Sequence, residues 1–256
     1  MTSSILSCLV VSLALMASLA SAQDKPSSPA FDYLVDGDLP QDDPANRTFK
    51  TLQAACEAAP AGTRERPTVI GIRPNVYRLP GGERGASLRL TKDNLTLLGL
   101  TDDRRAVVLA DDRGHKQGAG DNGFVLDVKA DGFTMRNLTL LNHCNVDYAY
   151  PGDATKNLAK RSDVITQAVA LQAAGDRHVY ENVAILSRLD TMFLKTTRSY
   201  FRDVHIEGTD DFIGGGQLSV WELCTISFPM GRGVMLATNV VFIDCAFEAT
   251  RGLQFY

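Results

Sequence analysis

Two aspartates hold the same position in successive repeats of the chain, with the residue type and spacing for acid–base or nucleophilic chemistry. Asp190 lies seven residues after Val183, and Asp211 lies seven residues after Val204. If these two segments stack as neighbouring strands, the carboxyl groups lie roughly 5 Å apart on one face. Two carboxyl groups that close share one proton, so one of them has a raised pKa. Such a pair suits an ionised nucleophile beside a protonated general acid.

A structural role is the alternative for an aspartate in such a position, because Asp side chains at bends accept hydrogen bonds from backbone N–H groups. Asp203 and Asp244 fit that role better than Asp190 and Asp211. Other catalytic signatures are missing from the sequence, which has no G-x-S-x-G, H-E-x-x-H or C-x-x-C motif and no nucleotide-binding Gly-rich loop. Each histidine is predicted to be solvated or internally satisfied, since none shows metal-ligand spacing: His115, His143, His178 and His205.

A repeated four-residue pattern identifies the segments that must hold the two aspartates. Each copy begins at a bend and continues with an apolar, a small and an apolar residue. The copies begin at Asn94, Asn137, Asn182, Asp203, Leu223 and Asp244. The starts are 43, 45, 21, 20 and 21 residues apart, so the first two gaps are interpreted as two periods of about 21 residues each. Aromatic residues keep one phase through the later copies: Tyr180, Phe201, Trp221 and Phe242.

A unit of about 21 residues cannot bury its own apolar face and must stack on copies of itself. The sequence therefore predicts an all-β fold, a right-handed parallel β-helix, with parallel strands over residues 68–250. A β-sandwich, the alternative, would lack a fixed long period. Apolar residues at helical spacing over residues 49–59, followed by Pro60, predict one short N-terminal helix that caps the coil.

The chain divides into three predicted parts. Residues 1–22 carry no charged side chain and end in Ala-Ser-Ala, which predicts a secretory signal peptide and an extracellular or periplasmic protein. Residues 23–44 are rich in Pro, Ser and Asp and are predicted to be a flexible leader, and residues 45–256 form the β-helix domain. A formal charge of −4 without any basic run argues against nucleic acid and anionic membranes as partners.

Four cysteines follow the predicted signal peptide, and their pairing is open. Cys224 and Cys245 hold equivalent inward positions on adjacent turns, whereas Cys56 and Cys144 lie far from them in sequence. An oxidising compartment would permit disulfides, but stacked inward residues need not meet disulfide geometry, and two buried thiols are the alternative. Spacing alone decides neither the disulfides nor the oligomeric state.

Five motifs that follow one another along the chain resemble those of one known family. The first two are residues 49–55, similar to its N-terminal helix, and residues 72–77 (I-R-P-N-V-Y), similar to its I-K-P-G-x-Y. The others are residues 167–171 (Q-A-V-A-L), residues 188–193 (R-L-D-T-M-F, resembling Y-Q-D-T-L-Y) and residues 211–215 (D-F-I-G-G, resembling D-F-I-F-G). The family is the pectin methylesterases, secreted pectinesterases of plants, fungi and bacteria.

The resemblance implies that the chain hydrolyses the methyl esters of galacturonate units in pectin, in cell wall modification and pectin degradation. Asp211 is then the nucleophile, Asp190 the general acid and base, and Gln167 the donor that stabilises the oxyanion. No metal and no organic cofactor are implied, and the partner is methylated polygalacturonate. Three residues are expected to bind the substrate: Phe193, Phe212 and Arg188. Arg188 would do so as a charge beside Asp190, and a solvated arginine is the favoured alternative for it.

The sequence also departs from the family. Leu189 stands where the family has a second glutamine, and losing one such oxyanion donor costs on the order of 10² to 10³ in rate. The family's later L-G-R-P-W motif does not occur before Tyr256, so the domain is expected to lack its C-terminal turns. Gly214 replaces a Phe, which predicts a smaller groove floor. A reduced activity is therefore expected, and two alternatives stay open: a catalytically dead β-helix that binds polysaccharide, and an acyl thioester hydrolase of the same fold.

Overall fold

The computed structural model describes residues 31–80, 85–121, 123–229 and 239–250. The predicted signal peptide, residues 1–22, lies outside these described residues. Within the described part of the chain, no helix is long and apolar enough to cross a membrane.

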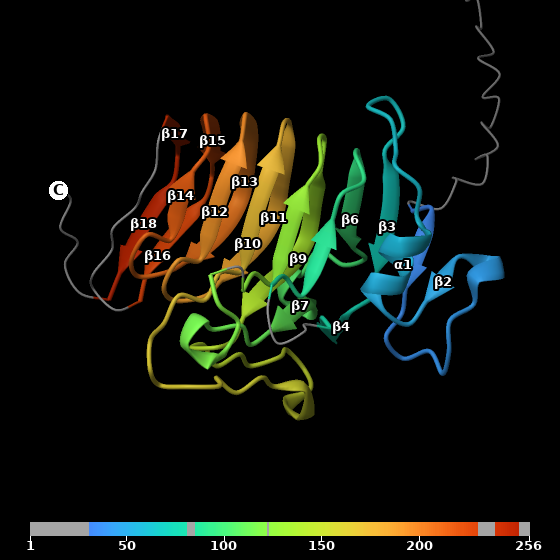
Figure 1. Cartoon of the computed structure of the whole chain (residues 1–256), viewed down its shortest axis with the longest axis horizontal. Helices are drawn as coiled ribbons and strands as arrows, with labels where there is room; N and C mark the ends of the chain where they lie inside the picture. Colours follow the sequence, from blue (N-terminus) through green and yellow to red (C-terminus); the bar gives the residue numbers. More distant parts are fainter. Residues whose placement is uncertain (1–30, 81–84, 122, 230–238, 251–256) are drawn as a thin grey trace, which may run out of the picture.

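Short parallel strands wind into a coil that forms the body of the molecule (Figure 1). Every pairing between the named strands is parallel. The larger sheet contains β1 (Tyr33–Val35), β2 (Thr48–Phe49), β3 (Thr68–Ile72), β4 (Asn75–Arg78), β6 (Leu95–Gly99), β7 (Val107–Asp111), β9 (Thr134–Asn142), β11 (His178–Leu186), β13 (Arg198–Glu207), β15 (Leu218–Glu222), β16 (Thr225–Phe228), β17 (Val240–Ile243) and β18 (Ala246–Ala249). The smaller sheet contains β5 (Leu88–Leu90), β8 (Leu126–Lys129), β10 (Leu171–Gly175), β12 (Met192–Thr196) and β14 (Ile213–Gly215).

The larger sheet is folded along a line of residues with left-handed backbone conformation. Strands β9, β11 and β13 each contain one, at Asn137, Asn182 and Asp203, with φ of 57°, 50° and 50°. Asn and Asp adopt this conformation more readily than other residues with a side chain, which is why they recur there. The first half of β13 pairs with β15 and its second half with β16, so the sheet has two faces. With the smaller sheet these complete a three-faced parallel β-helix, which confirms the predicted fold class.

The predicted period is wrong for the first two gaps. Strands β9 and β11 are direct neighbours, with Leu138 opposite Val183, so 45 residues make one turn and not two. The extra length is the segment between β9 and β10, which leaves the coil as a long loop (Figure 1). Asn94 does lie at a bend, with φ of 53°. Its backbone N–H donates to the carbonyl of Asp131 at 2.7 Å, so Asn94 stacks beside Asp131 and not beside Asn137, and it does not belong to the line of Asn137, Asn182 and Asp203. A loop lengthens a turn without adding a strand, and a sequence period cannot separate the two.

The N-terminal end of the coil is closed by helix α1 (Leu52–Ala58), as predicted. The Thr51 side chain accepts a hydrogen bond from the Ala54 N–H and begins the helix, while Phe49 belongs to β2. The predicted flexible leader is wrong for its described part, because β1 is inserted between β2 and β3 and Val35 is fully buried. The apolar run Tyr33–Val35 gains burial between its two neighbouring strands, which outweighs the Pro and Asp content of its flanks.

Aromatic rings stack inside the later turns and form much of the core there. The Tyr180 and Phe201 ring centroids are 4.6 Å apart, and those of Phe201 and Trp221 are 3.9 Å apart with nearly parallel planes. All three side chains are fully buried. The predicted aromatic column is therefore confirmed. The four described cysteines are free thiols, so Cys224 and Cys245 stack without forming a disulfide.

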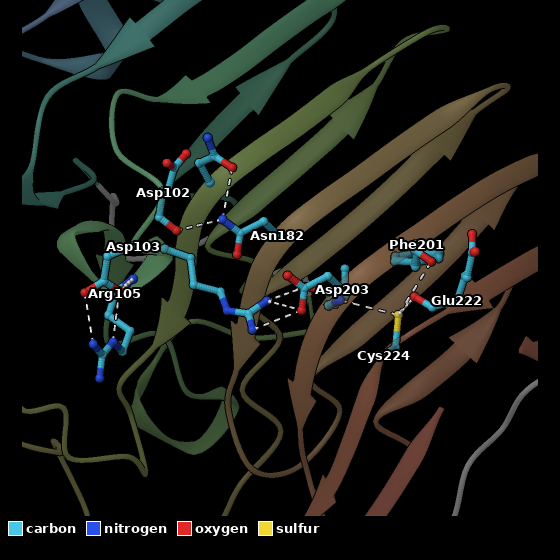
Figure 2. A network of polar contacts seen from close by, with 11 residues as sticks. Asp102, Asp103, Arg105, Asn182, Phe201, Asp203, Glu222 and Cys224 are labelled. Carbon is cyan, nitrogen blue, oxygen red and sulfur yellow. Dashed lines mark hydrogen bonds and ion pairs between the residues drawn. The ribbon is translucent and has the colours of Figure 1, made fainter. Parts of the chain in front are cut away.

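The loop before β7 fastens several turns together along the fold line (Figure 2). The Asn182 side-chain amide donates to the Asp102 carbonyl at 2.9 Å and to the Asn137 side-chain oxygen at 3.0 Å. Arg104 forms an ion pair with the Asp203 carboxylate at 3.3 Å and also donates to its carbonyl oxygen. These contacts join residues up to 99 positions apart, which holds the turns of β9, β11 and β13 in register.

One residue on the fold line has an unfavourable type for its conformation. Leu223 has φ of 56°, and its side chain is 50% exposed. The left-handed conformation costs a residue such as Leu roughly 1 kcal/mol, and Asn tolerates it better. We expect Leu223→Asn to raise the midpoint of thermal unfolding by about 2–4 °C, as a gain of about 1 kcal/mol does for a domain of this size. Circular dichroism melts would show this.

The matched control for Leu223→Asn is Leu218→Asn. Leu218 is similarly exposed, at 42%, and is not among the residues with positive φ. The control should leave the midpoint unchanged or lower it. Equal shifts in both variants would mean that lost surface hydrophobicity, and not relieved backbone strain, is responsible.

Candidate active site

The structure brings Asp190 and Asp211 together at equivalent turns of neighbouring strands. Asp190 precedes β12 and Asp211 precedes β14, and Met192 lies opposite Ile213 in the pairing of these strands. Both aspartates have left-handed backbone conformation, with φ of 62° and 50°. The Asp190 N–H donates to the carbonyl oxygen of Asp210 at 3.0 Å, which links the two turns directly.

The Asp190 carboxyl group is partly buried and lies near the carboxylates of Asp211 and Asp210. Partial burial, and after it the negative charges of Asp211 and Asp210, raise the pKa of Asp190 to about 6. A carboxyl group with this pKa holds its proton at mildly acidic pH. Asp190 is therefore suited to donate a proton, which is the role that the family resemblance implies for it.

Gln167 lies on the turn next to Asp190, opposite the residue that precedes Asp190. It forms an isolated parallel bridge with Leu189, and the Ala168 N–H donates to the Leu189 carbonyl at 2.9 Å. The Gln167 side chain is exposed, and its carbonyl accepts from the His115 N–H at 2.9 Å. Leu189 thus stacks on Gln167, and Leu189 occupies the position where a second oxyanion donor would lie.

A cavity of about 350 Å³ lies beside the aspartate pair, and Asp211 is not among the residues that line it. Gln167, Asp190 and Phe193 line it, so the structure places three of the predicted site residues in one groove. Its other lining residues come from the loop around the 3₁₀ helix η3 (His115–Gln117) and from the outer face of the smaller sheet: His115, Gly120, Asp121, Gly123, Phe124, Val169, Gln172 and Lys195.

Phe193 compensates for the small residue at position 214. A Cβ added to Gly214 would lie 2.8 Å from the Phe193 Cδ1 atom, so the Phe193 ring covers the glycine. Gly214 lies opposite Phe193 in the β12–β14 pairing. The expected smaller groove floor is thus partly filled from the neighbouring strand.

Phe212 is not a groove residue, and the prediction that it binds substrate is wrong. Its side chain is fully buried, and its ring packs edge-on against Phe228 with centroids 5.1 Å apart. A Cβ added at Gly208 would lie 2.2 Å from the Phe212 Cβ atom, so the side chain is also closely packed from that side. The turn at Asp211 directs the following residue inward, where burial stabilises an aromatic ring.

Arg188 does not place its charge beside Asp190 either. Its guanidinium forms an ion pair with Glu207 of the adjacent β13, and its side chain is only 19% exposed. Arg188 is also not among the residues that line the cavity. The expected charge beside Asp190 is therefore wrong, because an acidic partner within reach on the next turn neutralises the arginine.

Sequence reasoning missed two cavity residues on the smaller sheet and one on the loop. Gln172 and Lys195 point outward because they alternate with the buried Leu171, Ala173 and Leu194. His115, expected to be solvated or satisfied, has its Nδ1 atom 3.0 Å from an Asp121 carboxylate oxygen and lines the cavity. Strand alternation could have found Gln172 and Lys195, whereas His115 reaches the site only through a loop.

Known proteins are similar to this chain in both sequence and fold. A family model described as Pectinesterase matches residues 41–243. A pectinesterase of Ralstonia solanacearum is 35% identical over 121 residues, which cover 45% of this chain and 28% of that protein. Pectinesterase A of Dickeya chrysanthemi is 30% identical over 188 residues, which cover 70% of this chain and 48% of that protein.

A solved structure supports the same assignment. The pectin methylesterase PemA from Erwinia chrysanthemi has a TM-score of 0.58 and 27% identity, covering 79% of this chain and 56% of that one. Its likeness agrees with a right-handed parallel β-helix. The chain spans about a quarter to a half of the length of the two curated relatives. Because the family model matches most of the residues and two relatives agree with it, the chain belongs to the pectinesterase family.

Proposed function

We propose that this protein is a secreted carbohydrate esterase that hydrolyses methyl esters of galacturonate units in pectin. The observation that carries the proposal is the stacked pair of Asp190 and Asp211, in which Asp190 has a raised pKa and opens to the same cavity as Gln167. Membership of the pectinesterase family supports the substrate class. The uncharged N-terminal stretch of the sequence supports secretion.

The geometry suits a two-step ester hydrolysis. The ionised Asp211 attacks the ester carbonyl, and the tetrahedral oxyanion accepts a hydrogen bond from the Gln167 amide. Asp190 gives its proton to the departing methoxide, so methanol leaves and a mixed anhydride joins Asp211 to the galacturonyl group. Asp190, now ionised, takes a proton from water, whose oxygen attacks the galacturonyl carbon and releases Asp211 and the free acid.

The two alternatives from the sequence would give different products. A catalytically dead β-helix would bind pectin without releasing methanol, and an acyl thioester hydrolase would release thiol from acyl thioesters. Methanol release from highly methylated pectin, measured beside thiol release from an acyl thioester, separates the three. We expect methanol release that is slower than that of family members with two oxyanion glutamines, because Leu189 cannot donate a hydrogen bond.

The raised pKa of Asp190 predicts the pH dependence of this reaction. The free enzyme needs Asp190 protonated and Asp211 ionised, so kcat/KM should fall about tenfold per pH unit above about 6, where Asp190 loses its proton. Methanol release measured across neutral pH at constant ionic strength tests this. A kcat/KM that is flat or rising from pH 6 to pH 8 would show that Asp190 does not act as the acid.

Unfolding provides a readout for Asp190 that does not depend on activity. The pKa of Asp190 is higher in the folded chain than its ordinary value of 3.8, so the folded chain binds the proton more tightly than the unfolded chain. Stability contributed by this group is present below pH 3.8 and is lost as pH rises to about 6. Asp190→Asn should therefore unfold at a higher temperature than the parent chain at pH 7, and the difference should shrink at pH 4.

A further inference from the structure

An ion pair outside the cavity joins the two turns that carry the aspartates. Arg188 stands two residues before Asp190. Glu207 stands four residues before Asp211. The Arg188 guanidinium contacts the Glu207 carboxylate, and neither residue lines the cavity. Their side chains are only 19% and 21% exposed, so salt and water weaken this pair less than a fully exposed one. The pair therefore ties the turn before β12 to the turn before β14.

Hydrogen bonds around the ion pair use the same two residues. The Arg188 carbonyl accepts from the Thr209 N–H at 2.7 Å and from the Thr209 hydroxyl at 3.2 Å. The Glu207 carbonyl accepts from the Thr191 hydroxyl at 2.8 Å. Both threonines are buried, so water does not compete for these contacts. Each partner of the ion pair thus has its main chain bonded to the opposite turn.

The direction of each aspartate side chain depends on these turns. Asp190 and Asp211 have left-handed backbone conformation, which is costly for a residue with a side chain and persists where the surrounding structure imposes it. The Asp190 N–H is bonded to the Asp210 carbonyl on the facing turn. The separation of the two carboxyl groups therefore depends on how firmly the turns are held together.

The charges around Asp190 allow a positioning effect to be told from a direct electrostatic one. Burial raises the pKa of Asp190, and the charges of Asp211 and Asp210 add to this effect. Arg188 and Glu207 are not among the groups that shift this pKa. The other titratable groups around these residues are His115, Asp121 and Lys195 of the cavity, Lys160 near Arg188 and His205 near Glu207. Moving the turns apart would lower the pKa of Asp190, because weaker repulsion and greater hydration both favour its ionised form.

We propose that Arg188 and Glu207 are positioning residues, whose ion pair holds the two aspartate turns at the separation that ester hydrolysis requires. The pair does not line the cavity, so it acts through the turns and not on the substrate. Its effect on the rate rests on the proposed function, whereas its effect on the aspartate pair does not require turnover.

The first test follows the Asp190 carboxyl group without turnover. An NMR titration of the chain with isotope-labelled aspartate gives its pKa, and loss of the signal in Asp190→Asn assigns it. Arg188→Met and Glu207→Gln should both lower this pKa by roughly 0.5 or more from about 6, because both loosen the turns.

Direct charge effects would differ in sign between these two variants. Arg188→Met removes a positive charge and would raise the pKa of Asp190, whereas Glu207→Gln removes a negative charge and would lower it. A rise in the first variant with a fall in the second, or no change in either, would overturn the proposal. Circular dichroism checks that each variant is folded. Glu207→Gln keeps the size of the side chain and provides the test even if Arg188→Met does not fold.

The second test measures methanol release from methylated pectin. Arg188→Met and Glu207→Gln should each lower kcat about tenfold and change KM by less than about twofold, because the misplaced groups react with substrate that is already bound. The contact to Glu207 is made by one guanidinium nitrogen, Nη1, so a lysine can replace it. Arg188→Lys should therefore retain at least about half of kcat. A loss in Arg188→Lys as large as in Arg188→Met would overturn the role of the ion pair.

The matched control removes an ion pair between two other neighbouring turns. Arg136 on β9 lies 3.0 Å from Glu181 on β11, and Arg136→Met should change neither kcat nor the pKa of Asp190. Equal effects in Arg136→Met would mean that any loosening of the coil has the same result, which would overturn the proposal. If the parent chain releases no methanol, the proposed function fails, and the NMR titration alone then decides the positioning role.

Discussion

Replacing Asp211 with alanine is expected to reduce methanol release from methylated pectin by a factor on the order of 10⁴ or more. A carboxylate oxygen of Asp211 is the proposed nucleophile that forms the covalent intermediate. Without a nucleophile, only the rate acceleration from substrate binding and oxyanion stabilisation remains. Asp211 does not line the cavity, and β12 pairs with β14 through backbone atoms of residues 192–194 and 213–215. Methanol release with circular dichroism of the same samples checks both the loss and the fold.

The neighbouring Asp210 provides the matched control. It has the same residue type on the same turn, and it contributes its backbone carbonyl to the Asp190 N–H, which an alanine retains. Asp210→Ala should therefore keep most of the activity and lower the pKa of Asp190 slightly, because one neighbouring negative charge is removed. Brisk methanol release from Asp211→Ala, or an equal loss in Asp210→Ala, would contradict the assignment of the nucleophile.

Introducing glutamine at position 189 is expected to raise the rate of methanol release by a factor on the order of 10² to 10³. Leu189 forms a parallel bridge with Gln167, so a glutamine there would lie beside the existing donor. One additional hydrogen bond to an oxyanion in a partly enclosed site contributes this much to transition-state stabilisation. The gain should appear in kcat more than in KM, because the charge develops only in the transition state.

Two further variants make the effect of Leu189→Gln interpretable. Leu189→Met keeps an unbranched apolar side chain of similar volume without a donor and should not increase the rate. Leu189→Gln in the Asp211→Ala background should gain nothing, because no tetrahedral intermediate forms without the nucleophile. An increase in Leu189→Met, or no increase in Leu189→Gln while Asp211 stays essential, would show that position 189 does not face the oxyanion.

Much of the fold could be predicted because the repeats of a β-helix are local and alike. Asn and Asp recur where a turn requires the left-handed conformation, and Tyr180, Phe201 and Trp221 recur where a ring can stack on the ring below. The equal phase of Asp190 and Asp211 follows from the same repetition, and the structure places them on paired strands. The segment between Asn137 and Asn182 misled the prediction, because its loop happens to double the usual spacing.

The direction of individual side chains around the site was decided by the tertiary structure. Arg188 turns to Glu207 and Phe212 turns into the core, although both lie beside the catalytic aspartates in sequence. Conversely, Arg89 and Lys129 both form ion pairs with the buried Asp127. Sequence spacing does not reveal these contacts. The sequence by itself determined the repeat of the later turns, the fold class and the equal phase of the two aspartates, because these depend on residue type and regular spacing. The groove depends on contacts between turns far apart in the chain, which form only when the coil closes.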